Sequence, residues 1–383
     1  MPELRTIFKY ISLFKNFKTL LMNTIKRDAL FLLFLFSIHL AFSQITKVET
    51  PGPSGIKFKS AIDSQEYVAY IQLPDGYAKS NKKYPVVYVT DGQWFFNSVL
   101  QAYYGHHYDG FVPDLIIVGI TWTGEYDANR GRDFTPTRLE SFPTSGNASK
   151  FLSVIKNEII PYIDSTYRTD KNEKALYGTS LGGLFAIYTL FHEPTLFNRY
   201  MIISPSLWWD NELVFKYEKS FAEKNKSLHA KVFISTGEYE EATDFGHGFD
   251  RFGNQLRASK YNGLELETAV LEKMSHSASA TAGALRGLQF VFGKPDIKVD
   301  SVLLDQYAGH YLVNTDTILF TRSGNTLYLN LREGRLKLSA ETNESFYVKG
   351  VSGVGQFVKD NKGKITGYNL IQNGTTVFCK KID

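Results

Sequence analysis

The sequence predicts an α/β fold with a mostly parallel sheet covered on both faces, followed by a small antiparallel β domain. From Glu66 to about Phe292, strand-like apolar runs alternate with helix-like segments, the order that builds a parallel sheet with crossover helices. After the breaker-rich Gly293-Lys-Pro-Asp296, short strand-like runs are separated by turn-forming residues, as in hairpins. We therefore expect an N-terminal segment 1–43, a larger domain 44–298 and a β domain 299–383.

The expected elements follow from the apolar pattern and its spacing. In the larger domain we expect strands at 68–73, 86–90, 115–122, 174–177, 200–203, 232–236 and 266–271, and helices at 148–163, 183–191, 212–224, 248–260 and 279–292. In the β domain we expect strands at 317–321, 326–331, 336–338, 346–348, 356–359, 365–371 and 375–380.

The first 43 residues have the pattern of a signal peptide. Lys26-Arg27 precede the apolar core 29–40, and Ala41-Phe-Ser43 supplies small residues for cleavage before Gln44. The pattern also allows a start at Met22. The apolar core is shorter than the ~20 residues that span a bilayer, although an uncleaved anchor is the alternative. We expect a periplasmic or secreted protein without a lipobox, and no membrane association after cleavage.

Charge and cysteine content exclude several classes of protein. The net charge of +4 is fully accounted for by residues 1–43, which carry six Lys or Arg and two acidic residues. The rest of the chain is neutral overall, so we expect no nucleic-acid partner. The single Cys379 excludes an internal disulfide, and no Cys/His cluster has metal-site spacing. We expect neither a metal nor another cofactor.

A candidate nucleophile lies between a strand-like run and a helix-like run. Gly178-Thr-Ser180-Leu-Gly182 reads G-x-S-x-G, and a strand–turn–helix context places such a serine exposed at the tip of a sheet. The glycines leave room where a Cβ would clash. The amides that begin the helix are free to face an anion. A glycine-rich structural turn is the alternative.

A serine nucleophile needs a base, and the base needs an orienting acid. His276 fits best, because it lies between the expected strand 266–271 and the last helix, at the same sheet edge as Ser180; His247 is a competitor. The acid is expected after strand 232–236, where acidic residues crowd together. We favour Glu240, with Glu241, Glu238 and Asp244 as alternates.

Six stretches of the chain carry a resemblance to a known family, namely Tyr84–Gly92, Arg130–Pro136, Phe151–Tyr167, Tyr177–Gly183, Ser204–Trp209 and Gly237–Glu240. The chain resembles the "Putative esterase" (esterase D) family of α/β-hydrolases, and within it the siderophore-esterase-like branch. The resemblance covers residues 60–293 and implies that Ser180 is the nucleophile, Glu240 the acid and His276 the base. It also implies oxyanion donors from the amides of Leu181 and of either Gln93 or Trp94.

The substrate pocket can be outlined only by its candidate residues. Trp208 and Trp209 follow the strand after Ser180, and we expect one to pack in the core and the other to offer an apolar wall. Arg130 and Arg132 either contact substrate or form a structural pair with Asp133. The expected substrate is a small-molecule, saccharide or siderophore ester.

These observations predict an exported serine esterase that works through a Ser-His-Glu triad and an acyl-enzyme. The alternatives are an acyltransferase of the same fold, and a non-catalytic homologue that binds a ligand.

Overall fold

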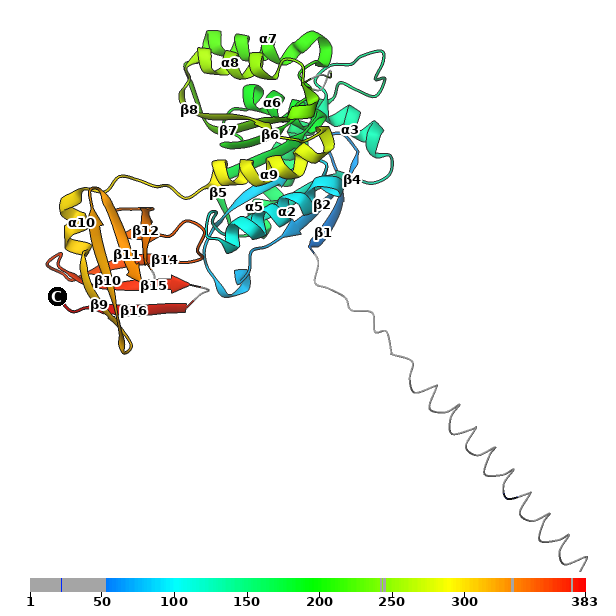
Figure 1. The fold of residues 1–383 in the computed structure, drawn as a ribbon. Helices are drawn as coiled ribbons and strands as arrows, with labels where there is room; N and C mark the ends of the chain where they lie inside the picture. The colour runs from blue at the N-terminus through cyan, green and yellow to red at the C-terminus, as the bar shows by residue number, and fades with distance from the viewer. Residues whose placement is uncertain (1–21, 23–52, 242, 244–245, 332–333, 373–374) are drawn as a thin grey trace, which may run out of the picture. The chain divides into compact units, whose positions relative to one another are not determined.

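The computed structural model describes residue 22 and residues 53–383, except 242, 244–245, 332–333 and 373–374. The predicted signal peptide therefore lies outside the described residues apart from Met22, and so does the alternate acid Asp244. The elements below are shown in Figure 1.

An eight-stranded sheet forms the larger part of the fold, in the order β1-β2-β4-β3-β5-β6-β7-β8. Neighbouring strands are parallel along the stretch β4-β3-β5-β6-β7-β8 of this order. In contrast, β2 is antiparallel to both β1 and β4. This confirms the predicted mostly parallel sheet. The strands are β1 Ser54–Lys59, β2 Glu66–Gln72, β3 Tyr84–Val89, β4 Ile116–Trp122, β5 Thr169–Thr179, β6 Arg199–Ile203, β7 Ser227–Gly237 and β8 Asn262–Leu271.

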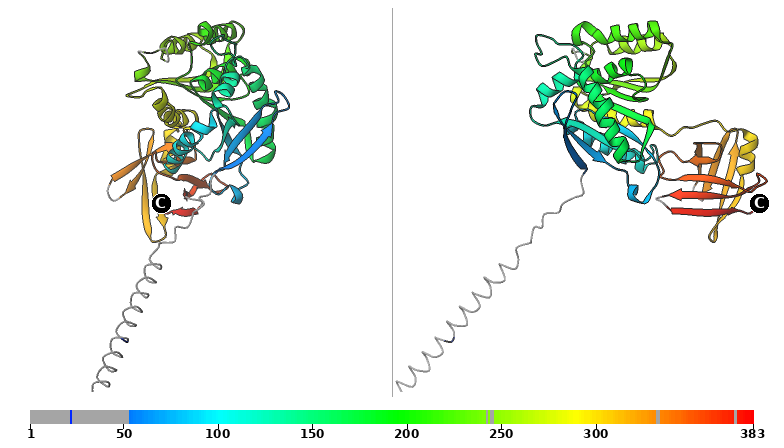
Figure 2. Two further views of the ribbon diagram at one scale, coloured as in Figure 1. Left: turned by 90° about the vertical axis from the view of Figure 1, so that its right-hand side faces the viewer. Right: turned by 180° about the vertical axis from the view of Figure 1, so that it is seen from behind.

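Helices cover both faces of this sheet (Figures 1 and 2). The two faces alternate along a strand: Val86 and Tyr88 join one core cluster, and Val87 and Val89 join the other, as the period of two requires. Helices α2 and α9 pack side by side on the second face. The helices are α2 Gly92–Tyr108, α3 Tyr126–Phe134, α4 Ala148–Val154, α5 Ile160–Thr166, α6 Leu181–His192, α7 Trp209–Lys224, α8 Phe249–Ser259 and α9 His276–Phe292, with short helical turns at Tyr77–Lys79, Ile155–Ile159 and Glu238–Glu240.

The C-terminal part is a closed antiparallel barrel preceded by one helix, α10 (Ser301–Tyr307). Pairing of the last strand with the first closes the barrel, which removes exposed strand edges. Its centre is filled by aromatic rings, with Tyr307 stacked on Phe357 at 4.0 Å between centroids. The strands are β9 Gly309–Val313, β10 Asp316–Ser323, β11 Thr326–Leu331, β12 Gly334–Ala340, β13 Ser345–Tyr347, β14 Val354–Lys359, β15 Ile365–Gln372 and β16 Thr375–Lys381.

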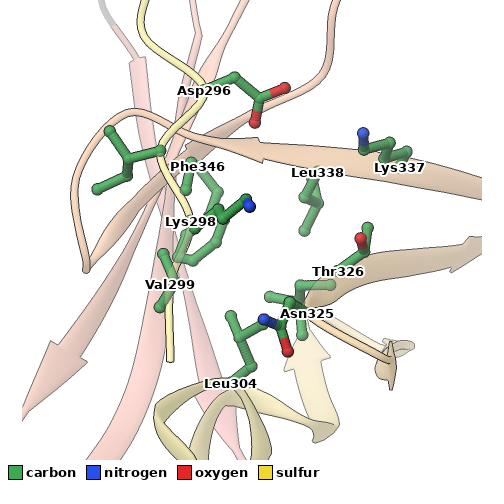
Figure 3. A pocket seen from close by; sticks show the side chains of 12 residues that line it. Asp296, Lys298, Val299, Leu304, Asn325, Thr326, Lys337, Leu338 and Phe346 are labelled. Atoms are coloured by element: carbon green, nitrogen blue, oxygen red, sulfur yellow. The ribbon is translucent and has the colours of Figure 1, made fainter. Parts of the chain in front are cut away.

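A cavity of about 250 Å³ lies beside the barrel (Figure 3). Its apolar wall includes Leu304, Leu338 and Phe346, and Lys298 and Lys337 also line it. All of its lining residues fall between 296 and 346. None of the residues predicted to carry the chemistry therefore lines this cavity.

Candidate active site

Ser180 occupies the sharp turn between β5 and α6. Its φ of 60° and ψ of −117° are rare for a residue with a side chain. A Cβ on Gly178 would lie 2.1 Å from the carbonyl oxygen of Gly182, so this close approach requires glycine. The Ser180 N–H donates to Ile203 at 3.0 Å, and its carbonyl accepts from Leu184 at 3.0 Å and Ser206 at 3.1 Å. These bonds hold the strained residue at the end of β5.

Glu240 is the acidic residue beside His276. It lies in the turn after β7 and is 1% exposed, whereas Glu238 and Glu241 are exposed. Its Oε2 lies 2.7 Å from Nδ1 of His276, the first residue of α9. A carboxylate can only accept, so Nδ1 carries the proton and Nε2 is left as the basic nitrogen.

The other carboxylate oxygen of Glu240 is also held by donors. Oε1 accepts from the Ser204 hydroxyl at 2.6 Å, the Gly237 N–H at 2.7 Å and the Ser279 hydroxyl at 3.2 Å. Burial works to raise the pKa of Glu240, but the bonds from His276, Ser204 and Gly237 outweigh it and hold the pKa below its ordinary value. Glu240 is therefore an ionised carboxylate at neutral pH.

The segment after β6 connects this acid–base pair to the candidate nucleophile. Ser204 donates to Glu240, and two residues later the Ser206 hydroxyl oxygen lies 3.5 Å from the hydroxyl oxygen of Ser180. Both serines are buried, at 1% and 3% exposure. One short segment, 204–206, thus contacts both Glu240 and Ser180. Sequence reasoning missed the contacts of Ser204 and Ser206, although the Ser-Pro-Ser-Leu-Trp-Trp motif marked the segment.

Two helix N-termini supply the candidate oxyanion donors. Leu181 begins α6 and Gln93 lies in the first turn of α2, and first-turn amides have no intrahelical acceptor. The Trp94 amide instead donates to the carbonyl of Asp91 at 2.9 Å. This contact favours Gln93 over Trp94.

The two tryptophans lie at the start of α7 rather than on a strand. Trp209 is fully buried and its indole N–H donates to Thr137 at 3.0 Å. Trp208 is half-buried, and its ring centroid lies 6.2 Å from that of Phe142, which is 40% exposed. Trp208 and Phe142 can therefore supply an apolar wall.

Both candidate arginines are paired with buried carboxylates. Arg132 donates to Asp133 at 2.7 and 2.8 Å, and Asp133 also accepts from the side chains of Tyr67 and Trp122. Arg130 donates to Asp91 at 2.9 and 3.0 Å. Asp133 is thus paired with only one of the two arginines, and the charge of Arg130 is matched elsewhere.

The competing base, His247, pairs with a different carboxylate. The His247 side chain is 64% exposed and lies 3.2 Å from Glu212.

Within the described ranges, no group of three His, Cys, Asp or Glu side chains is arranged to hold a metal ion. Among these same residues, no helix has the length and hydropathy needed to cross a membrane.

Comparison with known proteins identifies the family. The sequence model described as "Putative esterase" matches residues 60–280. The chain is 26% identical to the ferri-bacillibactin esterase BesA of Bacillus subtilis over 208 residues, 50% of this chain and 72% of that protein. It is 30% identical to the siderophore triacetylfusarinine C esterase of Aspergillus fumigatus over 168 residues, 41% and 57% of the two chains.

A solved structure supports the same relationship. The crystal structure of the BES protein from Bacillus cereus matches with a TM-score of 0.59 and 28% identity, over 66% of this chain and 98% of that chain. The resemblance inferred from the motifs is confirmed. The chain belongs to the "Putative esterase" family and is a serine hydrolase that acts on carboxylic ester bonds.

Proposed function

We propose that Ser180, His276 and Glu240 form a catalytic triad that hydrolyses an ester through an acyl-enzyme. The observation that carries this is the buried Glu240 carboxylate bonded to His276 Nδ1 at 2.7 Å, with the Ser204–Ser206 segment reaching from that carboxylate to Ser180. Glu240 fixes the imidazole tautomer and stabilises the imidazolium that forms during reaction.

The chemistry then follows from the position of each proton. The Ser180 oxygen attacks the ester carbonyl carbon while His276 Nε2 takes the hydroxyl proton. Collapse of the tetrahedral intermediate breaks the bond to the alcohol oxygen, and His276 returns the proton to that leaving alcohol. Water, deprotonated by His276, then attacks the acyl-enzyme. The bond between the acyl carbon and the Ser180 oxygen breaks, His276 returns the proton to that oxygen, and the acid is released. The amides of Leu181 and Gln93 stabilise the oxyanion at both stages.

We infer that the substrates are siderophore esters. Two relatives carry siderophore names, ferri-bacillibactin esterase and triacetylfusarinine C esterase. The half-buried Trp208, two residues after Ser206, and the exposed Phe142 offer an apolar wall. Hydrolysis of bacillibactin and triacetylfusarinine C, each with and without iron, tests this inference against simple aryl and sugar acetates. Turnover of the acetates alone would contradict it.

The proposed site of action is outside the cytoplasm. The basic Lys26-Arg27, the apolar core 29–40 and the small residues before Gln44 support export. Mature protein recovered from the periplasm or medium should begin at Gln44. N-terminal sequencing that found Met1 or Met22 on exported protein would contradict cleavage at this position.

The triad is tested by substitution with matched controls. Ser180→Ala and His276→Ala should each lower kcat for an aryl acetate by several orders of magnitude. Ser165→Ala and His247→Ala alter exposed side chains and should retain wild-type turnover. A fluorophosphonate should label Ser180, located by mass spectrometry of the peptide. Loss of activity in His247→Ala but not in His276→Ala would overturn the assignment of the base.

A further inference from the structure

The two proposed oxyanion donors belong to segments that are far apart in the sequence. Leu181 follows β5 in the Ser180 turn, and Gln93 follows β3 at the start of α2. Strands β3 and β5 are neighbours in the sheet. An oxyanion hole functions only when both amides lie at hydrogen-bond distance from the same oxygen. The distance between these two segments therefore affects the rate of the reaction.

Arg130, on α3, bridges the two segments. Its Nε donates to both carboxylate oxygens of Asp91, at 3.0 and 2.9 Å, and its Nη2 donates to the Thr179 carbonyl at 3.1 Å. Asp91 is the residue before α2, and its own carbonyl accepts from Trp94 and Phe95 in the first turn of that helix. Thr179 immediately precedes Ser180. One guanidinium thus contacts the residue before each donor segment.

The surroundings of Arg130 fix its position. Asp91 is fully buried, the Arg130 side chain is 15% exposed, and the guanidinium carbon lies 5.8 Å from the ring centroids of both Trp94 and Phe134. Burial raises the pKa of Asp91 to about 6, and the Arg130 charge partly opposes that rise. The carboxylate is therefore ionised and paired above that pH. A buried pair of this kind is weak evidence for added stability of the fold.

We propose that Arg130 is a positioning residue for the oxyanion hole, joining the Gln93 amide to the Ser180 turn through Asp91 and the Thr179 carbonyl. The proposal rests on the triad and donors of the proposed function. It assigns Arg130 a role other than substrate contact. The carboxylate of Asp91 balances its charge, and its hydrogen bonds go to Asp91 and to the Thr179 carbonyl. A guanidinium can donate in two directions at once from a rigid plane, whereas the compact ammonium of lysine cannot span the same acceptors.

The test is the kinetics of Arg130→Lys and Asp91→Asn at pH 8 with an aryl acetate. Loss of one aligned oxyanion donor costs about 10²–10³ in kcat, so both variants should lose kcat by about that factor with KM little changed. Binding of an arylboronic acid, which forms a tetrahedral adduct with the serine, should weaken in parallel. Arg199→Lys is the matched control. Arg199 is the first residue of β6, at the end of the strand opposite to Ser204, and it pairs with Glu173. Its side chain is similarly enclosed, at 17% exposure.

The possible results separate this proposal from the triad. A raised KM with unchanged kcat would assign Arg130 to substrate contact and overturn positioning. Equal kcat in wild type and Arg130→Lys, alongside an inactive Ser180→Ala, would overturn positioning and leave the triad intact. An active Ser180→Ala would overturn the proposed function itself. If Arg130→Lys does not fold by circular dichroism, Asp91→Asn decides, because it removes the negative charge and one of the two oxygens that accept from Arg130 while preserving side-chain size.

Discussion

At the scale of single residues, Glu240 is set apart from its acidic neighbours by what surrounds each carboxylate. Four acidic residues follow β7 within a short stretch, and Asp244 among them lies outside the described residues. Glu238 and Glu241 are exposed to water, whereas Glu240 is buried among four donors. A buried carboxylate is tolerated only where its charge is matched by such bonds. Those same bonds fix the orientation of His276.

Glu240→Gln should lower kcat by roughly 10²–10⁴, because the imidazole loses its tautomer lock and its counter-charge. Steady-state hydrolysis of an aryl acetate measures this, and Glu241→Gln is the control with an exposed side chain that should keep full activity. An inactive Glu241→Gln beside an active Glu240→Gln would move the acid by one residue.

The lowered pKa of Glu240 gives the same variant a second readout. A carboxyl whose pKa is lower in the folded than in the unfolded protein stabilises the fold at pH values above its unfolded pKa, which is near 4.5. That stabilisation disappears as the pH falls through the lower, folded value. The difference in Tm between wild type and Glu240→Gln should therefore shrink between pH 7 and acid pH. A difference that grew on acidification would show that the ionised form is not the favoured one.

At the scale of elements, the sequence predicted strands better than it predicted short or aromatic-rich helices. Buried parallel strands are continuous apolar runs, so seven strands of the sheet were placed at or near their observed positions. Helix α2 was missed because it starts directly after Asp91 and contains Gly105 and many aromatic residues, which are weak helix formers. Also missed were α3, which contains Gly131, and the short α10, β1 and β9.

The candidate site shows the same division between local and tertiary information. Ser180 is marked by a local motif, and Glu240 and His276 follow from their places after successive strands. The bridge from Arg130 to Asp91 joins positions 39 residues apart, and the Ser204–Glu240 bond joins positions 36 apart. Pairings at such separations depend on strand order and side-chain direction, which local sequence patterns do not specify.

The turn at Ser180 is an element whose shape depends on glycine. Gly178→Ala should destabilise the protein by at least ~2 kcal/mol, since the new Cβ would meet the Gly182 carbonyl at 2.1 Å. Gly105→Ala is the control, because this exposed glycine within α2 has nothing within 4 Å of an added Cβ. It should be neutral or stabilise the protein by about 0.5–1 kcal/mol. Urea unfolding measures both, and similar midpoints for the two variants would contradict the close packing of the turn.

At the scale of the whole molecule, the buried side chains fall into separate cores. Two clusters lie on the two faces of the sheet, and neither includes a residue after Phe292. A third cluster contains only residues from Val299 onward. A domain is a part of the chain with its own hydrophobic core. This separation supports the proposed boundary at Gly293–Lys298 between the hydrolase and the barrel.

A variant ending at Lys298 should therefore fold and hydrolyse a small aryl acetate with kcat close to that of the full chain. Every proposed catalytic group lies between Gln93 and His276, and both cores of the sheet remain complete without the barrel. The truncation removes the barrel's partners for the connecting segment, including the bond from the Tyr347 hydroxyl to the Lys294 carbonyl at 3.0 Å. These contacts lie at the end of the shortened chain, where loss of order costs little. Circular dichroism and aryl acetate turnover, measured on the same preparation, decide the outcome. A folded but inactive product would show that the barrel completes the active site, and failure to fold would show that the two parts depend on one another for stability.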